Sequence, residues 1–409
     1  MTAASPERAR ARDHSLLHRA GGAWTDRGTA CLVSAAPGSR EDAVRCHRRA
    51  IDLLRRLPVD ENAAYLADLG AAWVNLGCAL QACGDKAGPG GAVDAFDRGI
   101  ELLERLPIAD NFRFRHNLAA AWMGRADALA VVGTDAACSG ALRAYDRAIE
   151  VARRLPMEEK ASHRILLASC GINRGNLRQR AGDAGALSAA VESYDGALAA
   201  LGTLPQSGHR LACHHAATAW ANRGAALLLA SAGDNAGQAV DSARMSLAQI
   251  EGRDLVSPAS AELQLRALRV MAGGLETLLL ASGPAPRADT VAAMSNLAER
   301  GIALAVGCRE RAPGQLDPYL AWFFGFGSRI YGRYQPQFLA EFLDEVLGRW
   351  NDRAGPEAGA ELRSIAGQAV AAALQGLGRD RMWVEGTRHT ALLMSTVHEL
   401  RRAAPRFEP

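Results

Sequence analysis

The chain has 409 residues, of which 49% are hydrophobic and only 5% aromatic, and its formal net charge is +3. Acidic and basic residues are interspersed, which excludes a dedicated nucleic-acid surface, because such a surface needs a basic stripe or domain. The length allows two or three globular domains or one long repeat array, and the Ala-, Leu- and Val-rich composition favours closely packed helices.

Targeting signals and cysteine pairs are absent from the sequence. Residues 1–17 are polar and Arg-rich, without the apolar core of a signal peptide, and no uninterrupted apolar run reaches the roughly 18 residues of a membrane span. The eight cysteines occur singly, which favours reduced thiols over a disulfide or zinc framework. Nearly all basic residues are Arg, as a GC-rich genome would produce. We therefore expect a cytoplasmic, bacterial protein that does not contact membranes.

The first segment, residues 1–14, carries several charges and little apolar periodicity, which predicts a flexible leader. From residue 15 onward, key positions recur in steps of 49 residues. The large aromatic position holds Trp24, Trp73, Trp122 and Trp220. The small position four residues later holds Gly28, Gly77, Ala126, Gly175 and Gly224. A period of this size indicates stacked helical units that bury their apolar faces against one another.

Each unit contains two predicted helices. The first carries the Trp and the small residue on one face, where the small residue lets the partner helix approach closely. The second has apolar residues at three- and four-residue spacing and ends near a Leu-Pro pair, as at residues 57–58, 106–107 and 155–156. Left-handed glycines are expected to end four of the first helices, at Gly84, Gly133, Gly182 and Gly233.

Beyond residue 252 the pattern decays. Residues 253–310 are expected to form a degenerate sixth helix pair, and residues 311–409 a C-terminal helical cap with helices at 337–350, 357–376 and 383–403. Nine aromatic residues crowd between positions 319 and 342. They either cover the exposed face of the last repeat or form a patch through which a homodimer assembles.

The stretch Trp73-x-Asn75-Leu76-Gly77-x-Ala79-Leu80, with the repeated copies of its register, resembles the tetratricopeptide repeat (TPR) family. The family's usual unit is about 34 residues, whereas this one is extended to 49. The resemblance implies an all-α, right-handed α-solenoid of antiparallel helix pairs, with five TPR-like pairs over residues 15–252. It also implies a concave groove that binds a protein or peptide partner.

Candidate partner-binding residues follow from the family's inward-facing positions. These correspond here to Val74, Cys78, Met123, Asp127, Ile172 and Asn176. The lining is mostly small or apolar, which suits an apolar partner segment or the chain's own C-terminal helices equally well.

A second candidate set consists of arginines that precede the small residue of the first helix. Its members are Arg27, Arg125, Arg174 and Arg223. They either form a basic wall for acidic peptides, or lay their stems on apolar surface and reach a carboxylate such as Asp127.

Catalytic motifs are absent: the sequence has no zinc-protease motif, phosphate-binding loop or nucleophile elbow. We therefore expect a scaffold or adaptor protein that mediates protein–protein interaction, without catalysis, metal or cofactor. The alternative is a ligand-sensing regulator that closes around a small apolar molecule or short peptide. A third hypothesis, an enzyme, would use C-terminal groups such as Tyr331, Glu385, His389 or His398.

Overall fold

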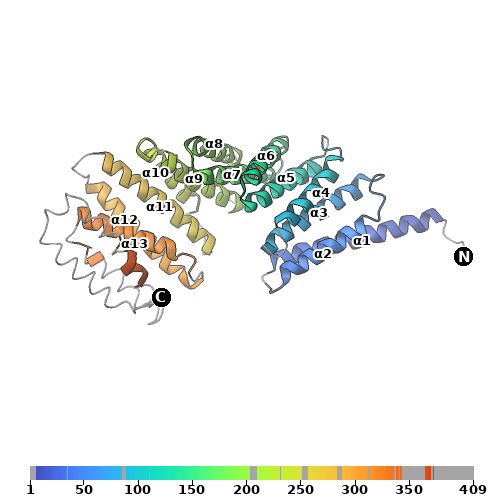
Figure 1. The fold of residues 1–409 in the computed structure, drawn as a ribbon, viewed down its shortest axis with the longest axis horizontal. Helices are drawn as coiled ribbons and strands as arrows, with labels where there is room; N and C mark the ends of the chain where they lie inside the picture. Colours follow the sequence, from blue (N-terminus) through green and yellow to red (C-terminus); the bar gives the residue numbers. More distant parts are fainter. Residues whose placement is uncertain are drawn as a thin grey trace. The chain divides into compact units, whose positions relative to one another are not determined.

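The computed structural model describes residues 6–34, 36–84, 89–109, 111–202, 210–230, 232–250, 257–282, 288–311, 314–335, 338–339, 341–342, 364–369 and 372. Within these ranges the regular elements are thirteen α-helices and one 3-10 turn, and no strand occurs. The helices pack as sequential antiparallel pairs (Figure 1), so the chain is all-α with a tandem-repeat, solenoid-like arrangement. The predicted fold class is confirmed at this level, and the superhelical hand stays a prediction.

The helix bounds follow the predicted units. The first helices of the five units are α1 (Pro6–Val33), α3 (Ala63–Cys83), α5 (Phe112–Val132), α7 (Ala161–Ala181) and α9 (Arg210–Ala230). Their second helices are α2 (Ser39–Leu54), α4 (Pro89–Glu104), α6 (Asp135–Arg153), α8 (Ala184–Leu201) and α10 (Ala232–Ile250). They are followed by α11 (Pro258–Ala281), α12 (Ala288–Gly307), η2 (Arg309–Arg311) and α13 (Asp317–Tyr334).

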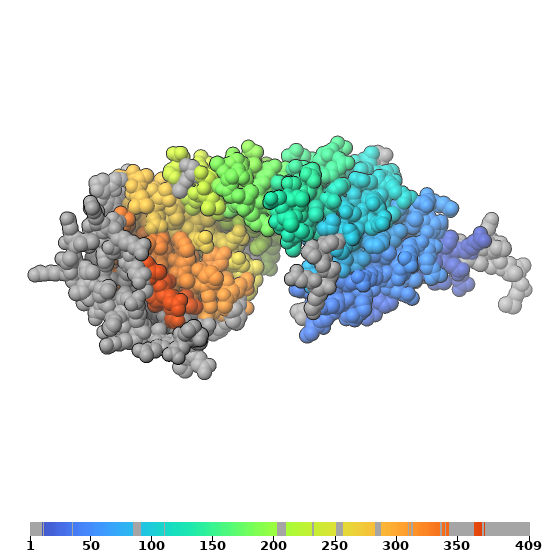
Figure 2. All heavy atoms as spheres, in the orientation of Figure 1, coloured from blue at the N-terminus to red at the C-terminus, as the bar shows by residue number. Residues whose placement is uncertain are grey.

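The chain divides into two compact units. One comprises Met1–Ala181 with Glu192–Ala212, and the other Gly182–Val191 with Cys213–Pro409. In the first unit each helix contacts its sequence neighbour, and successive first helices α1, α3, α5 and α7 also contact one another. The space-filling view shows the atoms of α1 to α4, coloured blue to cyan, packed against one another (Figure 2).

Close approach between paired helices depends on glycine. A Cβ on Gly77 of α3 would lie 2.9 Å from ring atoms of Phe96 on α4, and one on Gly175 of α7 would lie 2.6 Å from the Tyr194 ring. Both rings are fully buried. The small positions in these two pairs therefore let the paired helices approach closely, as predicted, and the group that enters the space is an aromatic ring of the second helix.

Two predicted boundaries are corrected. Helix α1 begins at Pro6, so residues 6–14 are helical rather than part of a leader, and proline is favoured at the first helical position. Gly233 lies inside α10 and has no positive φ, because α9 already ends at Ala230. The other three glycines, Gly84, Gly133 and Gly182, have the expected positive φ, at 63°, 74° and 78°. Gly133 is left-handed as predicted, whereas Gly84, with ψ of −145°, lies outside the left-handed helical region.

Helix α3 has the length and apolar composition that could cross a membrane, although half of the relevant window is buried in the protein. It packs against α2, α4 and α5. A helix buried among soluble partners passes the same test, and its single acidic residue, Asp68, forms an ion pair with His18 at 2.6 Å. We read α3 as a core helix of the repeat array.

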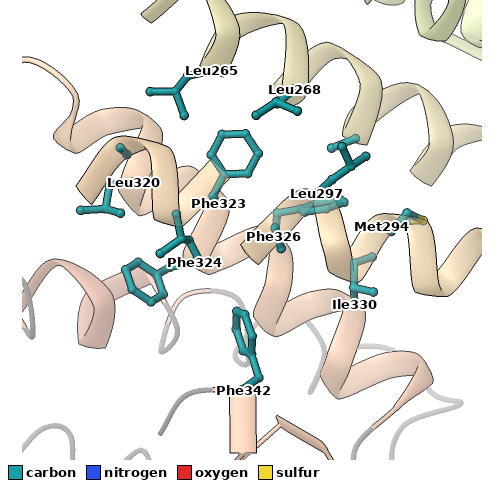
Figure 3. Close-up of a cluster of buried hydrophobic side chains, with 14 of the residues drawn as sticks. Leu265, Leu268, Met294, Leu297, Leu320, Phe323, Phe324, Phe326, Ile330 and Phe342 are labelled. Atoms are coloured by element: carbon teal, nitrogen blue, oxygen red, sulfur yellow. The ribbon is translucent and has the colours of Figure 1, made fainter. Parts of the chain in front are cut away.

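In the second unit, α11, α12 and α13 enclose an aromatic core (Figure 3). Phe323, Phe324 and Phe326 of α13 are fully buried. Phe323 and Phe326 point toward leucines of α11 and α12 (Figure 3). A Cβ on Gly301 of α12 would lie 2.5 Å from the Phe323 ring. Among the aromatic residues described between positions 319 and 342, only Phe338 is exposed. Most of the aromatic stretch therefore serves the chain's own core.

The three helices expected beyond residue 336 fall largely outside the described residues. Short helical pieces at 338–339, 341–342, 364–369 and 372 are described, and Phe342 and Ala366 join the core of α11 to α13. The expected helix at 383–403 lies wholly outside the described residues.

Candidate functional site

A row of side chains on the first helices occupies one position of the 49-residue register. We call it the polar row. In the compact unit that contains Met1–Ala181, its members are Thr29, Cys78, Asp127 and Asn176, one from each repeat. Thr29, Cys78 and Asn176 are exposed, and Asp127 is half-buried. The residue before each of them is the buried small residue of the repeat, whereas the polar row itself is reached by solvent.

Two members of the polar row accept hydrogen bonds from tyrosines of the second helices. Tyr145 of α6 donates a short hydrogen bond to the carboxylate of Asp127, and Asn173 of α7 donates another at 3.0 Å. One repeat later, the Tyr194 hydroxyl lies 2.9 Å from the side-chain oxygen of Asn176. Burial raises the pKa of Asp127, and the two hydrogen bonds oppose that rise. The tyrosine hydroxyls thus fix the orientation of two members of the row.

Cys78 has no hydroxyl facing it, because the matching ring is Phe96. Its side chain is exposed, yet the surrounding protein atoms and the Asp127 carboxylate raise its pKa to about 11. A thiol with this pKa is protonated at neutral pH and is a weak nucleophile, which argues against thiol catalysis at the row.

The apolar members of the predicted lining pack inside the protein. Ile172 is only 3% exposed, because α7 turns it into the interior. Val74 is half-buried, and its methyl group would lie 2.7 Å from a Cβ placed on Gly99 of α4. Met123 is half-buried against the cores around α5. These three residues hold neighbouring helices together, which leaves Cys78, Asp127 and Asn176 as the accessible part of the prediction.

The arginine set bridges helices. Arg125 of α5 binds Asp97 of α4 at 2.5 Å, and Arg174 of α7 binds Asp146 of α6 at 2.7 Å. The carboxylate is therefore on the preceding second helix, not at Asp127 as the sequence suggested.

Three of these guanidinium groups also lie over the tryptophan that stands three residues earlier in the same helix. Arg27, Arg125 and Arg223 lie 5.3, 5.7 and 5.7 Å from the centroids of Trp24, Trp122 and Trp220. Arg223 also donates to the Ser242 hydroxyl at 2.9 Å. Each arginine of the set therefore contacts a carboxylate, a hydroxyl or an indole of the chain itself, in line with the second of the two interpretations given for this set.

Groups suited to metal binding do not converge in the described part of the chain. No cluster of three or more His, Cys, Asp or Glu side chains with metal-binding geometry occurs there. Tyr331 is buried, and its hydroxyl lies 2.6 Å from Glu299, while Glu385, His389 and His398 lie outside the described residues.

A cleft of about 950 Å³ lies between the second helices α2 and α4, with α3 as its floor. Trp73, Leu76 and Leu80 of α3 supply apolar surface, and Arg48 of α2 and Asp94 of α4 stand on opposite walls. The remaining lining residues are Ile51, Asp52, Arg55, Gly91, Ala95, Asp97, Arg98 and Glu101. Sequence reasoning missed this cleft, although two positions in it, 48 and 76, depart from the repeating charge pattern.

Comparison with known proteins adds little to this geometry. No family model and no curated protein matches the chain. Among solved structures that match, one is a circular tandem repeat protein with a novel repeat topology and enhanced subunit contact surfaces. The two share 15% identity, with 96% of this chain and 98% of that chain covered and a TM-score of 0.34. The helices and the repeated residues of this chain show that it is a helical tandem-repeat protein, without an assigned family.

Proposed function

We propose that the chain is a TPR-like, non-catalytic scaffold or adaptor that binds a protein or peptide partner through the polar row. The supporting observation is the contrast between neighbouring positions of one register. In the first four repeat units the small position and the ring position keep their packing role, whereas the row directly after the small position changes from Thr to Cys, Asp and Asn. A surface that varies on a constant framework is suited to recognising different side chains along an extended partner.

The chemistry of the row supports recognition rather than reaction. Its members offer a hydroxyl, a protonated thiol, a carboxylate and an amide, and two of them are held by tyrosine hydroxyls. Fixed hydrogen-bonding groups cost a partner less ordering entropy than mobile ones. The eight cysteines, all without a disulfide, support a reducing, cytoplasmic setting for this binding.

The proposal is tested by affinity capture from native lysate with three forms of the chain. Cys78→Arg/Asn176→Arg places bulky charge on two exposed row positions, and Glu104→Arg introduces the same side chain at an exposed site of α4. A partner that the wild type and Glu104→Arg retain stoichiometrically should fall at least tenfold with the double variant. Equal retention by all three forms, or no stoichiometric partner, would refute the proposal.

The ligand-sensing alternative is favoured by one observation, the cleft between α2 and α4, because its volume falls in the range of roughly 300–1,000 Å³ that is typical of ligand sites. A homodimer through the aromatic stretch has less support, since Phe338 is the described ring there that is exposed. Sedimentation velocity of Phe338→Ser against wild type tests that assembly: a dimer should be weakened, and unchanged sedimentation would exclude this interface.

A further inference from the structure

The cleft between α2 and α4 is the place where the repeating ion pair of the array is missing. In the following units an aspartate on a second helix binds an arginine 28 residues later, on the next first helix. The pairs are Asp97 with Arg125 and Asp146 with Arg174. Both arginines are largely buried, with 25% and 18% of their side chains exposed, so they fill the space between successive second helices.

In the cleft both residues of this pair are replaced by residues of another type. Arg48 stands 49 residues before Asp97, and Leu76 stands 49 residues before Arg125. Leucine is too short and too apolar to bridge the helices, so the volume that a guanidinium occupies elsewhere stays open as part of the 950 Å³ cleft. Arg48 thus places a positive charge on the second helix at the position where later units carry an aspartate. The chain therefore supplies a cation here without its anion.

Trp73, on the floor of the cleft, also lacks the arginine that covers the equivalent tryptophan in other units. Trp24, Trp122 and Trp220 each have an arginine three residues later whose guanidinium lies over the indole. The residue three positions after Trp73 is Leu76, and within the described part of the chain no guanidinium lies over the Trp73 ring. Trp73 is half-buried and faces the cleft with part of its ring surface.

Two charges in the lining have no partner among the described residues, Arg48 on α2 and Asp94 on α4, and both side chains are exposed. The others are satisfied within the chain. Arg55 binds Asp52 at 3.1 Å, and Arg98 binds Glu101 at 3.1 Å. The remaining carboxylate of the lining, on Asp97, is held by Arg125. The cleft thus presents one cation and one anion that are unpaired among the described residues, on opposite walls above an apolar floor.

We propose that this cleft binds a peptide segment that carries an acidic side chain and a basic side chain on either side of an apolar one. The acidic side chain binds Arg48 and so supplies, with reversed polarity, the ion pair that later units form internally. The apolar side chain covers Trp73 and Leu80, and the basic side chain binds Asp94. The site is separate from the polar row, so it holds or fails independently of the scaffold function proposed above.

The size and composition of the cleft match such a segment. A volume of about 950 Å³ accommodates a few side chains, more than one amino acid needs. Unpaired charges on both walls fix the orientation of a bound segment, because the reversed orientation would place like charges together. A purely acidic or purely basic peptide satisfies only one wall.

The test uses a set of acetylated, amidated, fluorescently labelled hexapeptides in which Glu and Arg flank Leu at different spacings, measured by fluorescence polarisation. The central variant is Arg48→Asp/Leu76→Arg, which installs the ion pair of the later units. At least one peptide should bind the wild type, and the double variant should bind it at least tenfold more weakly, with an unfolding midpoint equal to or above that of the wild type.

Because Leu76 is buried, a second variant keeps the test decisive if the first fails to fold. Arg48→Glu changes only an exposed side chain, and it should shift preference at least tenfold toward the peptide in which Lys replaces Glu. The Cys78→Arg/Asn176→Arg form should bind the peptide as the wild type does, which separates this site from the polar row. Absence of any binding peptide, equal binding by wild type and Arg48→Glu, or binding of free leucine in place of peptides would overturn the proposal.

Discussion

Gly77 is the position at which the packing of the array can be tested most directly. A Cβ added there would lie 2.9 Å from three atoms of the Phe96 ring, closer than real contacts allow. The ring is also confined by α5, because a Cβ on Gly124 of that helix would lie only 2.4 Å from it. Phe96 is fully buried and is held between two glycines of successive first helices.

The expected effect of Gly77→Ala is the difference between two terms. Alanine in place of glycine inside a helix contributes about 1 kcal/mol of stability. Over-packing a filled core costs about 1–3 kcal/mol, and a ring confined by two helices belongs in the upper part of that range. We therefore expect the free energy of unfolding to fall by about 1–2 kcal/mol on balance.

Urea unfolding followed by far-ultraviolet circular dichroism measures this change. Gly22→Ala is the matched control, because it lies in α1 on an exposed face with no atom within 4 Å of the added Cβ. It should gain up to about 1 kcal/mol, since only the helix term applies. Phe96→Leu in the Gly77→Ala background should cost less than Phe96→Leu alone. If Gly77→Ala were as stable as Gly22→Ala, the ring-in-notch explanation of the repeat would be wrong.

Three further substitutions test other parts of the fold. Tyr145→Phe removes the hydroxyl that binds Asp127, so the free energy of unfolding should fall by about 1–3 kcal/mol in a denaturant titration, and the pKa of Asp127, followed by carboxyl NMR, should rise further. His47 is fully buried, both ring nitrogens lack partners, and burial lowers its pKa below 6.5. The unfolded chain therefore takes up its proton first, and stability should fall as pH drops through 6.5. His47→Phe should flatten this loss in urea midpoints between pH 7.5 and 5, and an unchanged pH profile would show that other groups cause it. Arg125→Met breaks the ion pair with Asp97 but keeps the stem, so the loss should be about 1 kcal/mol or less and smaller still in high salt.

The helical architecture was predictable because it depends on repeated residues whose roles are steric. Trp73 and Gly77 stand four apart on one helix face, and the copies of this pair in other units set the period of 49. The register of the second helices followed from apolar spacing and from the Leu-Pro ends, where Leu57, Leu106 and Leu155 are buried as the pattern requires. Periodic burial leaves a signal in sequence because every unit must satisfy the same contacts.

The accessible surface was predictable only in part. Ile172 and Cys78 occupy neighbouring family positions, yet Ile172 is 3% exposed and Cys78 is exposed. Which of them solvent reaches depends on helix rotation and crossing geometry in units longer than the family norm, and a period alone does not contain that information. The caps of α3 and α5 were also missed, although Asn62 and Asn111 share the register and accept bonds from backbone amides at 2.9 Å.

Departures from a repeat are of two kinds, and the difference between them separates packing from function in this chain. Where Phe96 is replaced by Tyr145 one unit later, Cys78 is replaced by Asp127, which accepts the new hydroxyl. That change is compensated within the chain, so it requires no ligand.

The exchange at positions 48 and 76 is not compensated. It removes an anion from one wall and a cation from the floor, leaves Arg48 without a partner among the described residues, and opens a cleft that later units fill with arginine. A charged side chain left unpaired beside a half-buried indole contributes little to stability and would be replaced at little cost by the Asp–Arg pair of the neighbouring units. That the chain departs from a pair it uses twice elsewhere is the reason to look for a ligand at this cleft before any other place in the array.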